Sequence, residues 1–188
     1  ILIMKTIPTF LLASCFIGSQ AKAQQEANPM LANAQTFIDV PYVAHTLETD
    51  GEEDLVINCD EVDCTTFVEY VLALSLPSAS GNKMSESDFA ANLQRIRYRE
   101  GKIDGYTSRL HYTSDWINNG VRGGFMEDVT AANSPYTQKL SLSYMSSHPK
   151  LYKHLSNSPE NVTRMAEYEK ALSGQEIHWL PKDKLPAN

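Results

Sequence analysis

The stretch from residue 64 to residue 76 carries apolar side chains at helical spacing. Its apolar positions include Phe67, Val68, Val71, Leu72 and Leu74. On a helix of 3.6 residues per turn they form one continuous face. Pro77 cannot continue a helix, and Asp63 or Thr65 can cap the unpaired amides of the first turn. The pattern therefore predicts a buried helix that begins at Cys64 and ends before Pro77.

Similar spacing predicts four more helices. Their ranges are 29–40, 85–96, 149–155 and 158–173. In the second of these, Phe89, Leu93 and Ile96 recur at helical spacing, and Ser85 with Asp88 is typical of a capped helix start. The last is closed by Gly174.

Short strands are predicted at residues 55–57, 139–145 and 176–180. The second of them alternates apolar and polar residues, which is typical of a strand. Residues 97–124 are rich in aromatic, Arg and Gly residues and contain no long apolar run. We expect this stretch to be a loop that lines a site on a more regular scaffold.

Cys64 lies at a position that favours a reactive sulfur. Unpaired N–H groups and the positive end of the helix dipole stabilise a thiolate, which is the nucleophilic form of cysteine. Two other interpretations stay open: Cys64 is a small buried residue, or it forms a disulfide with Cys59 in an oxidising compartment. Two cysteines without a nearby histidine pair make a poor zinc site, so we expect no metal.

The segment Asp63-Cys64-Thr65-Thr66-Phe67-Val68-Glu69 resembles the nucleophile segment of the NlpC-type papain-like cell-wall peptidases. Within that superfamily it is most similar to bacterial N-acetylmuramoyl-L-alanine amidase-like proteins. Residues 41–48 resemble the segment that precedes the nucleophile in that family. Residues 97–101, 105–112 and 114–117 resemble an insertion that follows the nucleophile helix.

This resemblance implies an α+β, papain-like fold of the NlpC type. Its helical N-terminal half would carry Cys64, and its antiparallel sheet would be incomplete in this chain. The implied reaction is hydrolysis of the amide bond between N-acetylmuramic acid and L-alanine in peptidoglycan or muropeptides, without a cofactor. The Cys64 thiolate would attack the carbonyl carbon while backbone amides at the helix start bind the oxyanion.

Two alternatives to this function remain. Many NlpC-type relatives are endopeptidases that cut the stem peptide after D-glutamate, and this chain could share that activity. It could also be a non-catalytic, truncated homologue that binds the cell wall. In each case we expect a monomer.

Five residues are predicted to contact the substrate: Tyr42, Arg109, His111, Tyr112 and Trp116. The resemblance implies that the Tyr42 hydroxyl bonds near the thiolate or the substrate carbonyl, the alternative being a packing aromatic. Arg109 could bind a peptide carboxylate through its guanidinium, or it could be a surface charge paired with Asp104 or Asp115. Trp116 fits a packing anchor better than a sugar platform.

His111 is a candidate base, because a thiol nucleophile is commonly paired with a histidine. In the resembled family, however, the catalytic histidine is expected on a strand of the sheet, which would fall beyond Leu180. Nothing after Asn133 matches that context. We therefore expect His111 to serve substrate binding or site architecture, and we expect the chain to lack its C-terminal part. The remaining downstream histidines are predicted to be surface or packing residues: His148, His154 and His178.

Charge and the N-terminal residues narrow the possible partners and location. The 188 residues carry a formal net charge of -7 without a basic run, which argues against a nucleic-acid binder. Residues 1–23 are predicted to be a signal peptide, with Met4-Lys5, an apolar segment too short for a membrane span, and Ala21-Lys22-Ala23 as cleavage signal. We expect an exported, periplasmic protein whose mature domain is 24–188. Lipidation through Cys15 is the alternative.

Overall fold

The computed structural model describes residues 28–78, 81 and 83–185. They form two units, which divide between Ile103 and Asp104. The predicted signal peptide and Cys15 lie outside the described residues. Within the described ranges, no helix is long and apolar enough to cross a membrane.

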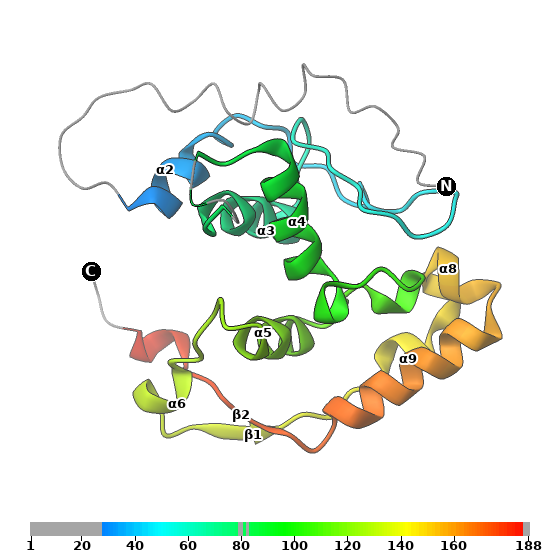
Figure 1. Cartoon of the computed structure of the whole chain (residues 1–188). Coiled ribbons are helices and arrows are strands. Elements are labelled where there is room, and N and C mark those ends of the chain that lie inside the picture. The colour runs from blue at the N-terminus through cyan, green and yellow to red at the C-terminus, as the bar shows by residue number, and fades with distance from the viewer. Residues whose placement is uncertain (1–27, 79–80, 82, 186–188) are drawn as a thin grey trace. The chain divides into compact units, whose positions relative to one another are not determined.

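Unit 1, which ends at Ile103, is helical. Its elements are α2 (Pro29–Gln35), α3 (Cys64–Ser75), α4 (Glu86–Arg97) and the short 3-10 helix η2 (Arg99–Gly101). Helix α3 packs against both α2 and α4 (Figure 1). The three helices predicted for this part of the chain are confirmed, although α2 ends at Gln35, earlier than expected.

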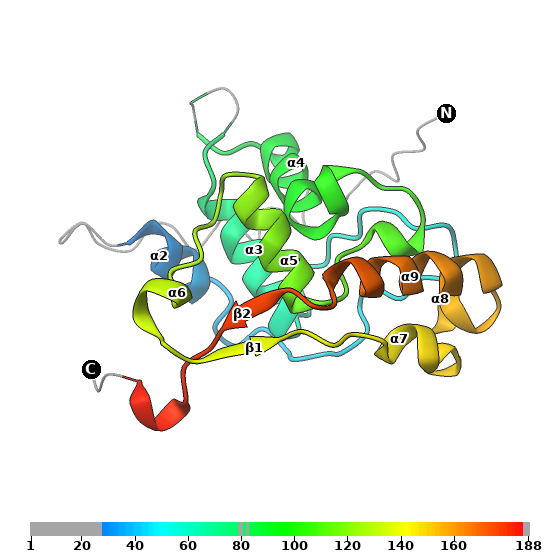
Figure 2. The ribbon, with the colours of Figure 1, turned by 90° about the horizontal axis from the view of Figure 1, so that it is seen from below.

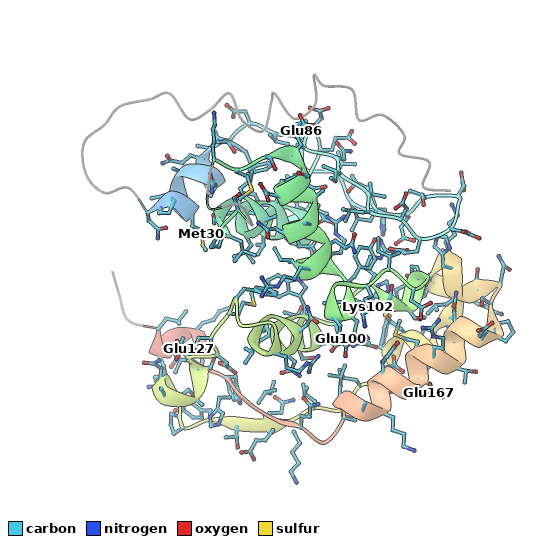
Figure 3. All side chains as sticks on the ribbon, in the orientation of Figure 1. Met30, Glu86, Glu100, Lys102, Glu127 and Glu167 are labelled. Atoms are coloured by element: carbon cyan, nitrogen blue, oxygen red, sulfur yellow. The ribbon has the colours of Figure 1, made fainter. Side chains whose placement is uncertain are left out.

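Helix α4 shows why these sequence signals were reliable. The Ser85 hydroxyl accepts a hydrogen bond from the Asp88 amide at 3.1 Å, and the Asp88 carboxylate accepts one from the Ser85 amide at 3.2 Å. Acidic Glu86, labelled in Figure 3, lies in the first turn, and Arg95 lies in the last. Both charges complement the helix dipole. The apolar face is buried as predicted.

The buried face of α3 differs from the predicted one. Glu69 and Tyr70 are at most 2% exposed, whereas Val68 is 41% exposed. Glu69 is tolerated inside because Arg97 of α4 pairs with it at 2.7 Å, and a buried charge needs such a partner. A prediction from apolar residues alone does not include a glutamate in the buried face, and it therefore assigns that face to a partly wrong side of the helix.

Residues 55–57 do not form the predicted strand. Their backbone groups are bound by side chains instead: the Val56 carbonyl accepts a hydrogen bond from Arg97 Nη1 at 2.5 Å, and the Leu55 amide donates to Asp54 Oδ1 at 2.7 Å. Just beyond, the Asn58 amide donates to the Tyr70 hydroxyl at 3.0 Å. The segment is thus held without a neighbouring strand.

Unit 2 begins at Asp104 and combines helices with a two-stranded antiparallel sheet. Its elements are η3 (Tyr106–Ser108), α5 (Thr113–Arg122), α6 (Thr130–Asn133), β1 (Thr137–Lys139), α7 (Tyr144–Ser147), η4 (Pro149–Leu151), α8 (Lys153–Ser156), α9 (Pro159–Leu172), β2 (Glu176–His178) and η5 (Lys182–Lys184). Strands β1 and β2 lie side by side in Figure 2, with Gln138 opposite Ile177. Because α5 is a regular helix, the prediction of a loop throughout residues 97–124 is wrong.

The strand predicted at residues 139–145 is also only partly correct. Strand β1 ends at Lys139, and α7 begins at Tyr144. The Glu169 carboxylate of α9 accepts hydrogen bonds from the amides of Met145 at 2.9 Å and Ser146 at 3.1 Å. These amides start a helical turn and are bound by a side chain, so they need no strand partner. The strand at β2 is confirmed.

A small apolar core lies beneath this polar contact. It consists of Tyr106, Met145, Leu155 and Met165, with Tyr112, Tyr152 and Val162 packed against it. The predicted combination of helices with a small antiparallel sheet is thus confirmed. The finer assignment to a papain-like fold stays a prediction.

Tyr112 links the core to the buried carboxylate. Its hydroxyl donates to Glu169 Oε1 at 2.6 Å and accepts from the Met145 amide at 3.1 Å. Burial, aided by the bond to Glu169, raises the pKa of Tyr112 to about 12. The folded state therefore favours the neutral phenol, and this contribution to stability is complete below about pH 10, the ordinary tyrosine value. It is lost as the pH rises from about 10 to about 12.

We expect Tyr112→Phe to reduce that alkaline dependence. The variant should unfold more easily at neutral pH by about 1–3 kcal/mol, because Glu169 and the Met145 amide lose a buried partner. Between about pH 10 and 12 its melting temperature should fall less steeply than that of the wild type. Thermal melts followed by circular dichroism across this range measure both effects. Equal slopes in the two proteins would contradict the assignment.

Candidate active site

Cys64 is the first residue of α3 and its side chain is exposed. It is a free cysteine, so the alternative of a disulfide with Cys59 is wrong. The interpretation as a small buried residue is wrong for the same position, because the side chain is exposed. The thiol is therefore accessible to a substrate or a reagent.

Asp63 caps the helix that Cys64 begins. Its Oδ1 atom accepts hydrogen bonds from the amides of Thr65 at 3.0 Å and Thr66 at 2.8 Å. The Phe67 amide donates to the Asp63 carbonyl at 2.9 Å. Three of the first four amides of α3 are thus occupied. The remaining amide, that of Cys64, lies beside the sulfur and interacts with the Tyr42 phenol.

Tyr42 interacts with this thiol, while its contact with a substrate stays a prediction. A parallel bridge pairs Tyr42 with Val62: the Val43 amide donates to the Val62 carbonyl at 2.9 Å, and the Val62 amide donates to the Pro41 carbonyl at 3.0 Å. The phenol is 69% exposed, so the alternative of a packing aromatic is wrong. A hydrogen bond with Cys64, helped by the charges of Cys64 and Asp63, raises the pKa of Tyr42.

The charge of this part of the chain acts in the same direction. Residues 28–82 contain ten Asp or Glu residues and no Lys or Arg. An anionic surrounding opposes the formation of a second anion, so the Tyr42 phenol stays protonated. A protonated phenol can donate a hydrogen bond to a sulfur or oxygen anion.

Arg109 and His111 gather around Tyr106 in unit 2. The Arg109 guanidinium carbon lies 5.0 Å from the centre of the Tyr106 ring, and the His111 ring lies 4.4 Å from it. Arg109 is only 6% exposed, and Asp104 pairs with Arg164 at 2.6 Å. Arg109 is therefore not a surface charge, whereas the alternative that it pairs with Asp115 stays a prediction.

The imidazole of His111 is oriented by its own loop. Its Nε2 atom lies 3.0 Å from the Tyr106 carbonyl oxygen, an arrangement that requires the proton on Nε2. The His154 ring also stacks on the Tyr106 ring, with 5.0 Å between the ring centres. This confirms the prediction that His154 is a packing residue. The role of His111 as a base or substrate ligand stays a prediction.

Tyr112 and Trp116 lie at the start of α5. The Tyr112 hydroxyl is engaged with Glu169, which gives this side chain a structural task. The Trp116 indole nitrogen is buried, and it has no hydrogen-bond partner among the described residues. Substrate contacts by these two residues, and by Arg109, stay predictions.

No group of three metal-ligating side chains occurs in the parts of the chain that the structure describes. The Tyr42–Cys64 pair at the capped start of α3 is the candidate for nucleophilic chemistry.

A family model described as AmiA-like, N-acetylmuramoyl-L-alanine amidase-like, matches residues 32–188. The chain belongs to this AmiA-like family. No curated protein matches the chain. The match includes both residues of the Tyr42–Cys64 pair.

Solved structures give a similar result. Two crystal structures of an N-acetylmuramoyl-L-alanine amidase from Bacteroides uniformis are 68% and 69% identical to this chain, each with a TM-score of 0.80. They cover 85% of this chain, which covers 68% and 66% of theirs. A Bacteroides fragilis protein provisionally named a xylanase is 71% identical to this chain, with a TM-score of 0.78. The match covers 83% of this chain and 67% of that protein. The chain thus spans about two thirds of the length of these structures.

The cap of the Cys64 helix gives a direct test of the site geometry in this AmiA-like protein. We expect Asp63→Ala to lower the free energy of unfolding by about 1 kcal/mol, because two first-turn amides lose their acceptor. Asp63→Asn keeps a side-chain acceptor and should cost only a few tenths of that. Urea unfolding followed by circular dichroism measures the difference. Equal losses in the two variants would show that the carboxylate charge, and not the cap, matters.

Proposed function

We propose that this AmiA-like protein hydrolyses the amide bond between N-acetylmuramic acid and L-alanine in peptidoglycan fragments, with Cys64 as the nucleophile. The observation that carries the proposal is the exposed, free thiol at a capped helix start, which interacts with the Tyr42 phenol and raises its pKa. The family and the solved relatives from Bacteroides uniformis are named for this amidase activity, which supports the choice of bond.

The mechanism follows from the groups around the sulfur. The Cys64 thiolate attacks the carbonyl carbon of the lactyl group, and the electrons of the C=O bond move to the oxygen. The Cys64 amide and the Tyr42 hydroxyl donate hydrogen bonds to this oxyanion. When the C–N bond breaks, the L-alanine nitrogen leaves with a proton, and the lactyl group remains on sulfur as a thioester. Water then hydrolyses the thioester and restores the thiol.

The leaving nitrogen needs a proton donor. His111 is one candidate for this donor, although sequence analysis favours substrate binding or site architecture as its role. We also propose that the protein is exported to the periplasm, where peptidoglycan fragments are available, and that it acts as a monomer. Lipidation through Cys15 remains the alternative for its attachment.

A second chemistry is raised by the Bacteroides fragilis relative. Glycoside hydrolysis requires two carboxyl groups that flank the scissile bond. Two of the buried carboxylates, Glu69 and Glu169, are bound within their own units, to Arg97 and to Tyr112 respectively. These two serve the fold, and the exposed thiol of Cys64 supports the amidase.

Product analysis tests the proposed reaction. We expect the wild type to release an intact stem peptide, with a free L-alanine amine, from muropeptides, and Cys64→Ala to release none. Mass spectrometry of the products measures this. Cys64→Ser is the matched control, because it keeps the size of the side chain but offers a much weaker nucleophile.

Other products would identify the alternatives. Cleavage after D-glutamate would show an endopeptidase, and shortened xylan chains would show a glycosidase. Unchanged muropeptides, in the presence of a folded protein whose Cys64 reacts with a thiol reagent, would favour a non-catalytic wall-binding homologue.

Tyr42→Phe tests the second oxyanion donor. We expect kcat to fall on the order of 100-fold, as for the loss of one donor from an oxyanion site, with KM little changed. Because the pKa of Tyr42 is raised, the contribution of its hydroxyl should persist above the ordinary tyrosine range before it is lost with rising pH. The pH dependence of kcat in the two proteins measures this. A variant with unaltered kcat would remove Tyr42 from the mechanism.

A further inference from the structure

The segment that leads to Cys64 has no regular secondary structure, yet it is fastened at three points. The Tyr98 hydroxyl donates to the Asp54 carbonyl at 2.8 Å. Arg97 Nη1 donates to the Val56 carbonyl at 2.5 Å. The Asn58 amide donates to the hydroxyl of Tyr70 at 3.0 Å. Tyr70 belongs to α3, Arg97 is the last residue of α4, and Tyr98 follows it directly, so these two helices determine where residues 54–58 lie.

Arg97 is the central member of this set. Its Nε atom lies 2.7 Å from Glu69 Oε2, and the two side chains are 1% and 3% exposed. Its guanidinium carbon lies 5.7 Å from the centre of the Tyr70 ring. Burial disfavours the charged guanidinium, but the Glu69 carboxylate outweighs this and raises the pKa of Arg97. The planar guanidinium of Arg97, on α4, therefore binds Glu69 of α3 and the Val56 carbonyl at the same time.

The same segment continues to the site. Beyond Asn58, the Val62 amide donates to the Pro41 carbonyl at 3.0 Å and the Val62 carbonyl accepts from the Val43 amide at 2.9 Å. These two bonds hold Pro41 and Val43, the residues on either side of Tyr42. Since Cys64 is two residues after Val62, the position of Tyr42 relative to the thiol depends on the path of residues 56–62.

We infer that Arg97 is a positioning residue: by binding Glu69 and Val56 together, it sets the path of residues 56–62 and thereby holds Tyr42 against Cys64. It touches neither the thiol nor the substrate. Its effect on turnover rests on the proposed function, whereas its effect on the segment does not.

The competing explanation is that Arg97 only joins two helices. Asn92 offers a matched control, because its side-chain amide donates from α4 to the Ala73 carbonyl of α3 at 3.1 Å, and within the described residues it makes no hydrogen bond to residues 54–62. Asn92→Ala should lower the melting temperature and leave kcat unchanged. A positioning residue and a purely structural one are thus separable.

The test variant is Glu69→Met combined with Arg97→Met. Replacing both partners of a buried pair with apolar residues of similar volume leaves no lone charge inside and commonly preserves folding. Arg97→Lys is the second variant in case the double one does not fold. Lysine keeps the charge beside Glu69 but lacks the fork that also reaches Val56.

Two measurements decide the outcome. Hydrogen exchange should become at least about tenfold faster at the amides of Val43 and Val62, while α3 and α4 stay protected. With muropeptides, kcat should fall about 10- to 100-fold at nearly constant KM, because a small misplacement near the reacting atoms is costly.

Unaltered exchange at Val43 and Val62 would overturn the inference, whatever the activity. So would an equal loss of kcat in Asn92→Ala, since it would show that general stability is responsible. If the wild type does not turn over muropeptides, the proposed function fails, and the exchange measurement alone still decides whether Arg97 positions the segment.

Discussion

The Glu69–Arg97 ion pair is the constraint on which unit 1 depends. Two charged side chains are removed from water, and their desolvation is compensated only by close geometry and further hydrogen bonds. Arg97 meets this demand by contacting Glu69 and the Val56 carbonyl at once. Losing one partner would leave a lone buried charge and cost about 3–5 kcal/mol. The pair thus links helix packing to the path of the chain that reaches Cys64.

Unit 2 uses a buried carboxylate in a related way. Glu169 lies on a long helix, as Glu69 does, and its oxygens accept from the Tyr112 hydroxyl and from the amides of Met145 and Ser146. Glu69 acts on its segment through Arg97, whereas Glu169 binds backbone amides directly. In both units a charged residue inside the protein satisfies backbone groups of a segment that has no strand partner.

This shared device explains where the sequence was informative and where it was not. Helices α3, α4 and α9 were predictable, because capping residues and apolar spacing act locally. Residues 55–57 and most of 139–145 were wrongly predicted as strands. Their apolar residues are typical of strands. Their backbone groups, however, are hydrogen-bonded by side chains from distant positions in the sequence, which no local pattern reveals. For the same reason, the local pattern did not reveal that Glu69 is buried and paired with Arg97.

The candidate site was likewise predictable in part. Cys64 and its cap could be predicted from adjacent residues, and Tyr42 from the resemblance, whereas the availability of individual amides could not. Asp63 stabilises the helix by taking the amides of Thr65 and Thr66, and this removes two donors that a helix start would otherwise offer to an oxyanion. What remains beside the sulfur is the Cys64 amide. A second donor must come from elsewhere, and the Tyr42 phenol, whose pKa is raised by a hydrogen bond with Cys64 and by the charges of Cys64 and Asp63, has the required chemistry. The strength of the cap and the need for Tyr42 are therefore two consequences of the same aspartate.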